Sequence, residues 1–323
     1  MKAIVQDQYG EADVLRLDEI DIPQIGPKEV LVRVHAAGVD RGAWHLMAGK
    51  PYAVRLAVGV RAPRQRVRGL DLAGTVEAVG AEVTRFEVGD EVYGIGKGSF
   101  AELAAAREDK LARKPANLGF EQAAVVPVSG LTALQAVHDV GQVKAGQRVL
   151  VVGASGGVGS FAVQLAKAAG AEVTGVCSTS KVDLVRALGA DHVVDYQSAD
   201  FADAAEPYDL VLDIGGSTPL ARLRQVLTPT GTLVIVGGEG GGNLTGMGRQ
   251  LHAVAVSPFS KQRLAMMVAK EHYSGLERLT TYLEAGQVVP SLERCYPLRE
   301  TAEAVRRLVA GDVRGKVALT VPG

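Results

Sequence analysis

The chain has 323 residues, 47% of them hydrophobic, and a formal net charge of -1 at pH 7. This length and apolar content suffice for a sizeable core and suggest about two domains. The near-zero charge gives no general attraction to nucleic acid or to an anionic membrane. Cys177 and Cys295 form no metal motif or disulfide framework, and no secretory signal or membrane span is visible. We therefore expect a cytoplasmic protein with no nucleic-acid or membrane partner.

The first third of the chain has the pattern of short strands between glycine-containing turns. Strands are predicted at 29–36, 71–79, 90–95 and 99–104. A helix is predicted at 42–48. From Gly119 to Val140 the pattern becomes helical, and Pro127 divides it into two helices because proline interrupts a helix interior.

The middle of the chain alternates strands with helices. Strands are predicted at 148–152, 172–177, 192–196, 208–213 and 232–236, and helices at 181–188 and 219–227. This βαβαβ order is typical of an α/β, doubly wound Rossmann domain with a parallel sheet. The glycine-rich segment 239–247 is predicted to be a mobile loop. Toward the end, helices are predicted at 276–285 and 301–310, and strands at 294–298 and 316–321.

A glycine-rich turn joins the strand at 148–152 to the next helix. It reads Gly153, Ala154, Ser155, Gly156, Gly157, Val158, Gly159. Glycines permit positive φ and close approach of the backbone to a pyrophosphate, which the free N–H groups of a helix start can hold. Ser155 departs from the strict G-x-G-x-x-G spacing, so the βαβαβ context carries the interpretation. The alternative is an α/β turn that binds nothing.

The cofactor choice depends on the end of the second strand, where an acid would bind the adenosine ribose 2′-hydroxyl. This place reads Cys177-Ser178-Thr179-Ser180-Lys181 and has no acid. Hydroxyls and an ammonium can satisfy a 2′-phosphate, so we predict NADPH, with Ser178 and Lys181 as the selecting pair. The alternative is that residues 178–180 cap the next helix.

Several motifs occur in a fixed order along nearly the whole chain. They are GLDLAGTVEAVGAEVTRFEVGDEVYG, GSFAEL, VPVSGLTALQAV, VLVVGASGGVG, ALGADHVVDY, YDLVLDIGG and GTLVIVGG. In these the chain resembles the zinc-independent, quinone-oxidoreductase-like branch of the medium-chain dehydrogenase/reductase superfamily. The resemblance implies a GroES-like, β-rich catalytic domain over 1–122 and 261–323 and a Rossmann NADP(H)-binding domain over 123–260. It also implies a homodimer or homotetramer.

Zinc-dependent relatives bind their catalytic metal at three positions, which match Asp40, Leu70 and Val128 here. Leucine and valine cannot bind a cation, so we predict no metal. Quinone-oxidoreductase-like members usually carry asparagine where Asp40 stands. A charged aspartate would oppose an oxyanion rather than stabilise it.

Without a Lewis acid, the hydride acceptor must already be activated, as a quinone or a conjugated enone or enal is. We therefore predict a zinc-independent NADPH-dependent oxidoreductase acting on such a small molecule. Candidate catalytic groups are Tyr52, whose phenol could donate to the developing oxyanion, with Asp40 and His45. The alternatives are a packed aromatic for Tyr52, a helix N-cap for Asp40 and an ordinary helix residue for His45.

The resemblance implies further cofactor contacts. Thr132 would lie near the nicotinamide, and Val236 and Gly237 would offer backbone groups to the same ring. Lys316 would reach the cofactor, and Tyr196 would cover the 2′-phosphate or the adenine.

Two other functions stay open. Arginines recur before Gly69, at Arg55, Arg61, Arg64, Arg66 and Arg68. They could hold the phosphates of a coenzyme A thioester, which would make the protein an enoyl-thioester reductase, or they form a solvated loop. The non-enzyme alternative is an NADPH-binding regulatory or structural protein with little turnover.

Overall fold

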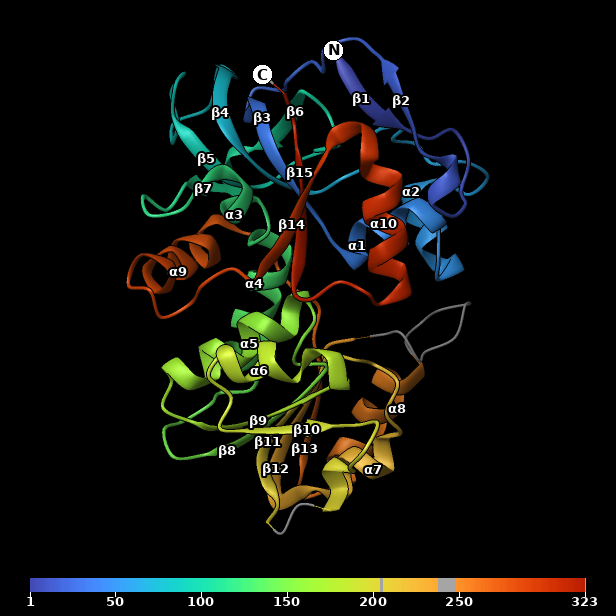
Figure 1. The fold of residues 1–323 in the computed structure, drawn as a ribbon. Coiled ribbons are helices and arrows are strands. Elements are labelled where there is room, and N and C mark those ends of the chain that lie inside the picture. Colours follow the sequence, from blue (N-terminus) through green and yellow to red (C-terminus); the bar gives the residue numbers. More distant parts are fainter. Residues whose placement is uncertain (204–205, 238–247, 323) are drawn as a thin grey trace. The chain divides into compact units, whose positions relative to one another are not determined.

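The computed structural model describes residues 1–203, 206–237 and 248–322. They form two compact units (Figure 1). Unit 1 combines residues 1–131 with 271–286 and the chain from 290 onward, and unit 2 consists of residues 132–270 and 287–289. The predicted loop at 239–247 lies outside the described residues. None of the helices in the described ranges is long and apolar enough to cross a membrane.

Unit 1 is built on a 7-stranded sheet in the order β14-β15-β3-β4-β5-β7, with β6 paired to β3. Strand β3 (Glu29–Val39) is its central element, because β4 lies along one edge while β6 and β15 share the other. The other strands are β4 (Asp71–Val79), β5 (Glu91–Ile95), β6 (Leu103–Arg107), β7 (Leu111–Arg113), β14 (Leu292–Pro297) and β15 (Lys316–Thr320).

The sequence of β3 explains its central place. Val30, Val32 and Val34 alternate with less buried residues and enter the core, as expected for a strand with one apolar face. The strand then becomes uniformly small and buried toward Gly38. A Cβ on Gly38 would lie 2.4 Å from Ala124 O, so a larger residue would push the neighbouring helix away.

The remaining elements of unit 1 surround this sheet (Figure 1). Strands β1 (Lys2–Val5) and β2 (Arg16–Glu19) form a separate antiparallel pair. The helices are α1 (Arg41–Ala48), α2 (Arg55–Val58), α3 (Phe120–Ala124), α9 (Tyr273–Glu284) and α10 (Thr301–Ala310). Helix α4 (Pro127–Leu134) begins in unit 1 and ends in unit 2.

Unit 2 contains a 6-stranded parallel sheet in the order β10-β9-β8-β11-β12-β13. Its first strand, β8 (Arg148–Val152), is an unbroken apolar run buried on both faces, as parallel strands usually are. The other strands are β9 (Glu172–Cys177), β10 (His192–Asp195), β11 (Tyr208–Asp213), β12 (Leu227–Ile235) and β13 (Arg263–Met266). The helices are α5 (Gly157–Ala168), α6 (Val182–Ala187), α7 (Leu220–Gln225) and α8 (Gly248–Val256).

The structure corrects two details of the sequence prediction. The strand predicted at 99–104 is wrong in its place. Phe100 O accepts the Ile4 N–H, the Phe100 N–H donates to Arg68 O, and β6 begins only at Leu103. The second helix predicted beyond Pro127 continues as a π-helix over Gln135–Val140, which the sequence pattern did not predict.

Candidate functional site

The turn between β8 and α5 is held in a shape that only glycine permits at two positions. Gly153 has φ +87, and a Cβ there would lie 2.9 Å from Gly215 N. A Cβ on Gly159 would lie 2.1 Å from Gly153 O. The N–H groups of Gly153 and Ala154 both donate to Val176 O, at 3.1 and 3.0 Å. These contacts fix the turn against the end of β9.

Gly156 has a different role, because a Cβ there would meet only Gly153 O at 3.5 Å. It is the N-cap of α5 and offers no side chain to the first N–H groups of that helix. Those groups have no partner within the helix, and the helix dipole makes this end partly positive. The open space beside Gly156 therefore fits the phosphates of a dinucleotide.

The turn follows β8, which is the strand at which the order of strands across the sheet changes direction. From β8 the chain proceeds to β9 and β10 on one side, and then to β11, β12 and β13 on the other. In such sheets ligands bind in the crevice outside the carboxyl ends of the strands. Val236 and Gly237 follow β12, and their N–H groups donate to Asp213 O, so any contact with a ring would use their carbonyl groups.

Asp213 and Arg249 form a buried ion pair at this edge. Arg249 on α8 donates to the Asp213 carboxylate and to Gly216 O. Burial raises the pKa of Asp213, and Arg249 opposes that shift. The pair anchors α8 and the Gly216 turn to the end of β11. The pair was not predicted from the sequence, although an acid that ends an apolar strand is a visible signal.

The predicted 2′-phosphate residues lie at the ends of β9 and β10. Ser178 is the N-cap of a short 3-10 turn (Thr179–Lys181) but makes no capping side-chain bond. Lys181 is half-buried, and Tyr196 is 61% exposed. These positions stay predictions of cofactor contacts.

A carboxylate that the sequence analysis missed lies beside them. Asp195 Oδ2 is 2.5 Å from Thr179 Oγ1, and Asp195 Oδ1 accepts a bond from Gln197 N at 3.0 Å. The Thr179 bond lowers the pKa of Asp195, so the group is ionised. Asp195 ends β10, the third strand of unit 2 along the chain, and its register opposite Cys177 brings it next to Ser178.

Three buried ionisable side chains lie together at one end of the central strands of the unit 1 sheet. Asp40 follows β3, Asp71 begins β4, and Lys316 begins β15. Val39 pairs with Val317, and Ala37 pairs with Leu72, so the register brings these three strand ends together. All three side chains are almost fully buried.

Within this group, Lys316 Nζ forms an ion pair with Asp71 Oδ2 at 3.5 Å. Asp71 Oδ1 accepts the Val128 N–H at 2.9 Å, at the start of α4. Burial raises the pKa of Asp71 to about 8, with Lys316 opposing the shift and Asp40 adding to it. The ammonium of Lys316 thus faces Asp71 here, and its contact with a cofactor stays a prediction.

Asp40 is the N-cap of α1, which confirms the alternative left open above. Its Oδ1 accepts the Ala43 N–H at 2.9 Å. Its Oδ2 is buried and has no hydrogen-bond partner among the described residues. The carboxylate therefore has one oxygen committed to the helix and one uncommitted.

His45 and Tyr52 lie further along the same segment. His45 Nδ1 is 2.8 Å from Lys50 O near the end of α1. Tyr52 is 46% exposed, so it is not a packed core aromatic. The Arg55 guanidinium lies 4.9 Å from the Tyr52 ring centroid. Thr132, which is predicted to lie near the nicotinamide, is half-buried on α4 and belongs to unit 2.

Three of the five arginines before Gly69 have structural partners. Arg55 donates to Gly49 O at 2.9 Å, and Arg68 donates to Leu46 O at 3.4 Å, so both complement the negative end of α1. Arg66 pairs with Asp7 at 2.7 Å. The solvated-loop interpretation is therefore wrong for Arg55 and Arg68, whereas Arg66 is exposed and agrees with it.

The three positions that bind zinc in metal-dependent relatives do not form a metal site. Asp40 and Leu70 do lie close together, since a Cβ on Gly42 would be 2.8 Å from Asp40 Oδ1 and 3.7 Å from Leu70 Cδ1. Leu70 and Val128, however, supply no nitrogen, oxygen or sulfur donor from their side chains. Across the described residues, no three His, Cys, Asp or Glu side chains are placed to hold a metal ion.

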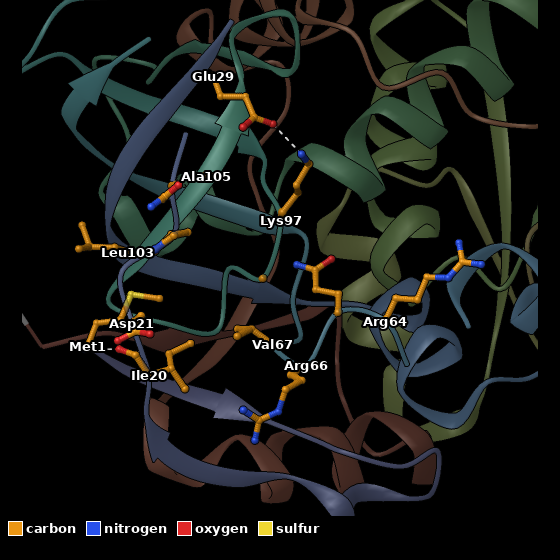
Figure 2. A pocket seen from close by; sticks show the side chains of 14 residues that line it. Met1, Ile20, Asp21, Glu29, Arg64, Arg66, Val67, Lys97, Leu103 and Ala105 are labelled. Atoms are coloured by element: carbon orange, nitrogen blue, oxygen red, sulfur yellow. Dashed lines mark hydrogen bonds and ion pairs between the residues drawn. The ribbon is translucent and has the colours of Figure 1, made fainter. Parts of the chain in front are cut away.

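A separate hollow of about 420 Å³ lies in unit 1 (Figure 2). It contains none of the predicted catalytic or cofactor residues. Lys97 on its rim is paired with Glu29 at 2.6 Å, and the Arg64 guanidinium extends away from Met1 and Ile20. Its lining also includes Asp21, Arg64 and Arg66, of which Arg66 pairs with Asp7, and we assign no ligand to it.

Comparison with known proteins agrees with this architecture. Residues 26–116 match the alcohol dehydrogenase GroES-like domain, and residues 188–319 match the zinc-binding dehydrogenase family. A mitochondrial NAD(P)H oxidoreductase of Bos taurus is 34% identical over 99% of this chain and 89% of its own length. A chloroplastic NADPH-dependent alkenal/one oxidoreductase of Arabidopsis thaliana is 33% identical over 99% of this chain and 79% of its own.

The structure of the quinone oxidoreductase from Coxiella burnetii superposes with a TM-score of 0.88 at 29% identity, covering 100% of this chain and 99% of that one. The two-unit fold, the glycine turn and the nonligating residues at the metal positions agree with these likenesses. The chain therefore belongs to the medium-chain dehydrogenase/reductase superfamily, in its quinone-oxidoreductase-like branch of NAD(P)H oxidoreductases.

Proposed function

We propose that this protein is an NADPH-dependent reductase that transfers hydride to a quinone or to a conjugated enone or enal. The observation that carries the proposal is the joint presence of the dinucleotide cradle at Gly156 and nonligating side chains at Leu70 and Val128. The first supplies a place for the hydride donor. The second leaves no protein-held Lewis acid to activate an ordinary ketone.

Hydride transfer then depends on an activated acceptor and on hydrogen-bond donors that stabilise the developing charge. The bound nicotinamide supplies a hydride. Quinones and enones accept it because the charge that develops is delocalised onto oxygen, where a donor can stabilise it. Tyr52 suits this role because its hydroxyl makes no hydrogen bond within the described residues and its ring is partly exposed. Solvent can supply the final proton.

NADPH, rather than NADH, is the finer part of the proposal. Ser178 and Lys181 follow β9, where an acid would favour NADH. Asp195 lies nearby, but its carboxylate is already bonded to Thr179 and Gln197. A 2′-phosphate could therefore use Lys181 without displacing a bond of Asp195.

We also propose a homodimer in a reducing, cytoplasmic compartment. Strand β13 ends the unit 2 sheet, and the apolar side chains beside it are exposed. Phe259 is 91% exposed, Val268 72% and Leu251 58%. An open strand edge flanked by apolar side chains is suited to pairing with a second copy.

The experiment that tests the reductase proposal is NADPH consumption by chelator-treated protein. A simple quinone and a conjugated enone are compared side by side, and the reduced products are identified. Turnover of either supports the proposal, and the product shows whether oxygen or carbon received the hydride. Loss of turnover after chelation that zinc restores contradicts it. Tight NADPH binding with no acceptor reduced favours the non-enzyme alternative.

A further inference from the structure

The segment between β3 and β4 is unusual in its charges. Residues 41–70 contain no aspartate or glutamate, but they contain one lysine and six arginines. Arg55, Arg66 and Arg68 have the structural partners described above. The remaining cations differ in whether the fold supplies a partner for the charged group.

Arg61 and Arg64 are both exposed and have no carboxylate partner within the described part of the chain. Arg61 makes no hydrogen bond there at all. The Arg64 guanidinium makes one long bond, from Nη1 to Ala57 O at 3.4 Å. Each guanidinium therefore keeps its paired N–H groups for an external anion, and the bidentate geometry suits a carboxylate or a phosphate.

The side chains next to them are apolar and face outward. Tyr52, Leu56 and Val60 recur at four-residue intervals, and they are 46%, 74% and 61% exposed. Arg55 of the same turn points inward instead, where its guanidinium lies 4.5 Å from the Tyr9 ring centroid and bonds Gly49 O. A surface helix normally buries its apolar face and exposes its charges. Here Leu56 lies on the short helix α2, Tyr52 precedes it and Val60 follows it, and all three apolar side chains are exposed while Arg55 is turned inward.

We propose that Tyr52, Leu56, Val60, Arg61 and Arg64 form a binding surface for the non-reacting part of the acceptor. We call it the 52–64 surface. It would take an amphiphile whose apolar chain lies on Leu56 and Val60 and whose anionic end pairs with Arg61 and Arg64. The inference rests on the proposed reductase function, because Tyr52 is the candidate donor to the reacting oxygen. It narrows the substrate class to long-chain acceptors that carry an anionic group.

The test compares acceptors that share one reactive enone. One has a short alkyl group, one has a long neutral alkyl chain, and one has a long chain that ends in a carboxylate. The variant is Arg61→Gln with Arg64→Gln, and the matched control is Arg66→Gln, whose cation already has Asp7. Because exposed ion pairs are individually weak, we expect the double variant to raise KM for the carboxylate acceptor roughly threefold to tenfold. KM for the short neutral acceptor should not change.

A second variant tests the apolar half. Leu56→Ser with Val60→Ser should remove the preference for the long neutral acceptor over the short one, and it should leave the short acceptor unaffected. The proposal is overturned if the arginine variant changes all acceptors alike, or if the Arg66→Gln control changes KM for the carboxylate acceptor as much.

Equilibrium binding separates failure of this surface from failure of the reductase function. Dodecanoate is titrated into the wild type and the arginine variant, each saturated with NADPH. Weaker binding to the variant supports the surface even if no enone is reduced, and equal affinities overturn it. Sedimentation with phosphatidylglycerol vesicles that requires Arg61 and Arg64, with KM values unchanged, would assign the surface to a membrane and overturn the acceptor proposal.

Discussion

Burial gives Asp71 an acid–base behaviour that its sequence position does not reveal. Its pKa rises from 3.8 to about 8, chiefly because the carboxylate loses water. Between these values the folded protein holds a proton that the unfolded chain has released. The free energy of unfolding should therefore fall as pH rises through this window, by at most about 1.4 kcal/mol for each pH unit.

Asp71→Asn should flatten this pH dependence, because the amide does not titrate. Above about pH 8 it should also lower stability, since the wild-type carboxylate is then ionised and the variant would leave Lys316 with a buried charge and no counter-ion. Urea unfolding of both proteins at several pH values between about pH 5 and about pH 8.5 measures this. Equal slopes for the two proteins would show that the Asp71 carboxyl does not titrate in this range.

Asp40 stabilises helix α1 as its N-cap, but its carboxylate charge would oppose a developing oxyanion. Its Oδ1 caps α1, and its uncommitted Oδ2 places negative charge where the metal-binding positions of relatives converge. Asn is as good an N-cap as Asp. Asp40→Asn should therefore change stability by less than about 0.5 kcal/mol while raising kcat for enone reduction, because it removes a charge that opposes an oxyanion.

Asp40→Ala serves as the matched control. It removes the same charge but also the cap, so it should lower the free energy of unfolding by about 1 kcal/mol. Thermal unfolding and steady-state kinetics on the three proteins separate the two roles. A lower kcat in Asp40→Asn would mean that the carboxylate itself assists the reaction.

At the scale of elements, Gly156 and Gly159 at the start of α5 differ in the space that each has for a side chain. Gly156→Ser places a side chain in the open space and offers its hydroxyl to the N–H groups that a phosphate would use. Because serine is a preferred N-cap, stability should be maintained or rise slightly. NADPH affinity should fall at least about tenfold, or about 1.4 kcal/mol, since one phosphate site is occupied.

Gly159→Ala is the contrasting substitution. Its Cβ would lie 2.1 Å from Gly153 O, so the turn must shift and the protein should lose about 1 to 3 kcal/mol of stability. Calorimetric titration with NADPH and thermal unfolding measure both quantities in both variants. If Gly156→Ser bound NADPH as tightly as the wild type, the phosphates would not lie beside α5.

At the scale of the whole molecule, the sequence predicts the features that depend on short, continuous stretches of residues. The apolar run of β8, the glycine turn and the βαβαβ order are local patterns, and the parallel sheet of unit 2 confirms them. The N-cap alternative for Asp40 was likewise visible, because an aspartate precedes a helix pattern. The nonligating Leu70 and Val128 needed only residue types and the family resemblance.

What the sequence could not predict depends on register between distant strands. Asp71 and Lys316 are separated by most of the chain, and only the pairing of β15 with β3 and of β3 with β4 makes them an ion pair. Asp195 approaches Ser178 only through the register of β10 with β9. The fate of each arginine before Gly69 likewise depends on which carbonyl or carboxylate the fold brings to it.

The last prediction concerns association of whole molecules. If β13 pairs with a second copy, the exposed Phe259 and Val268 beside it become buried at the interface, which in stable dimers covers at least about 1,200 Å² in total. Phe259→Glu with Val268→Glu should then give a monomer, because four buried carboxylates would be unpaired. Ile22→Glu, at an apolar site of unit 1 that is 56% exposed, should leave the assembly intact. Sedimentation velocity over a range of concentrations measures all three proteins. A wild-type protein that sediments as a monomer at every concentration, or a double variant that still sediments as a dimer, would place β13 outside any interface.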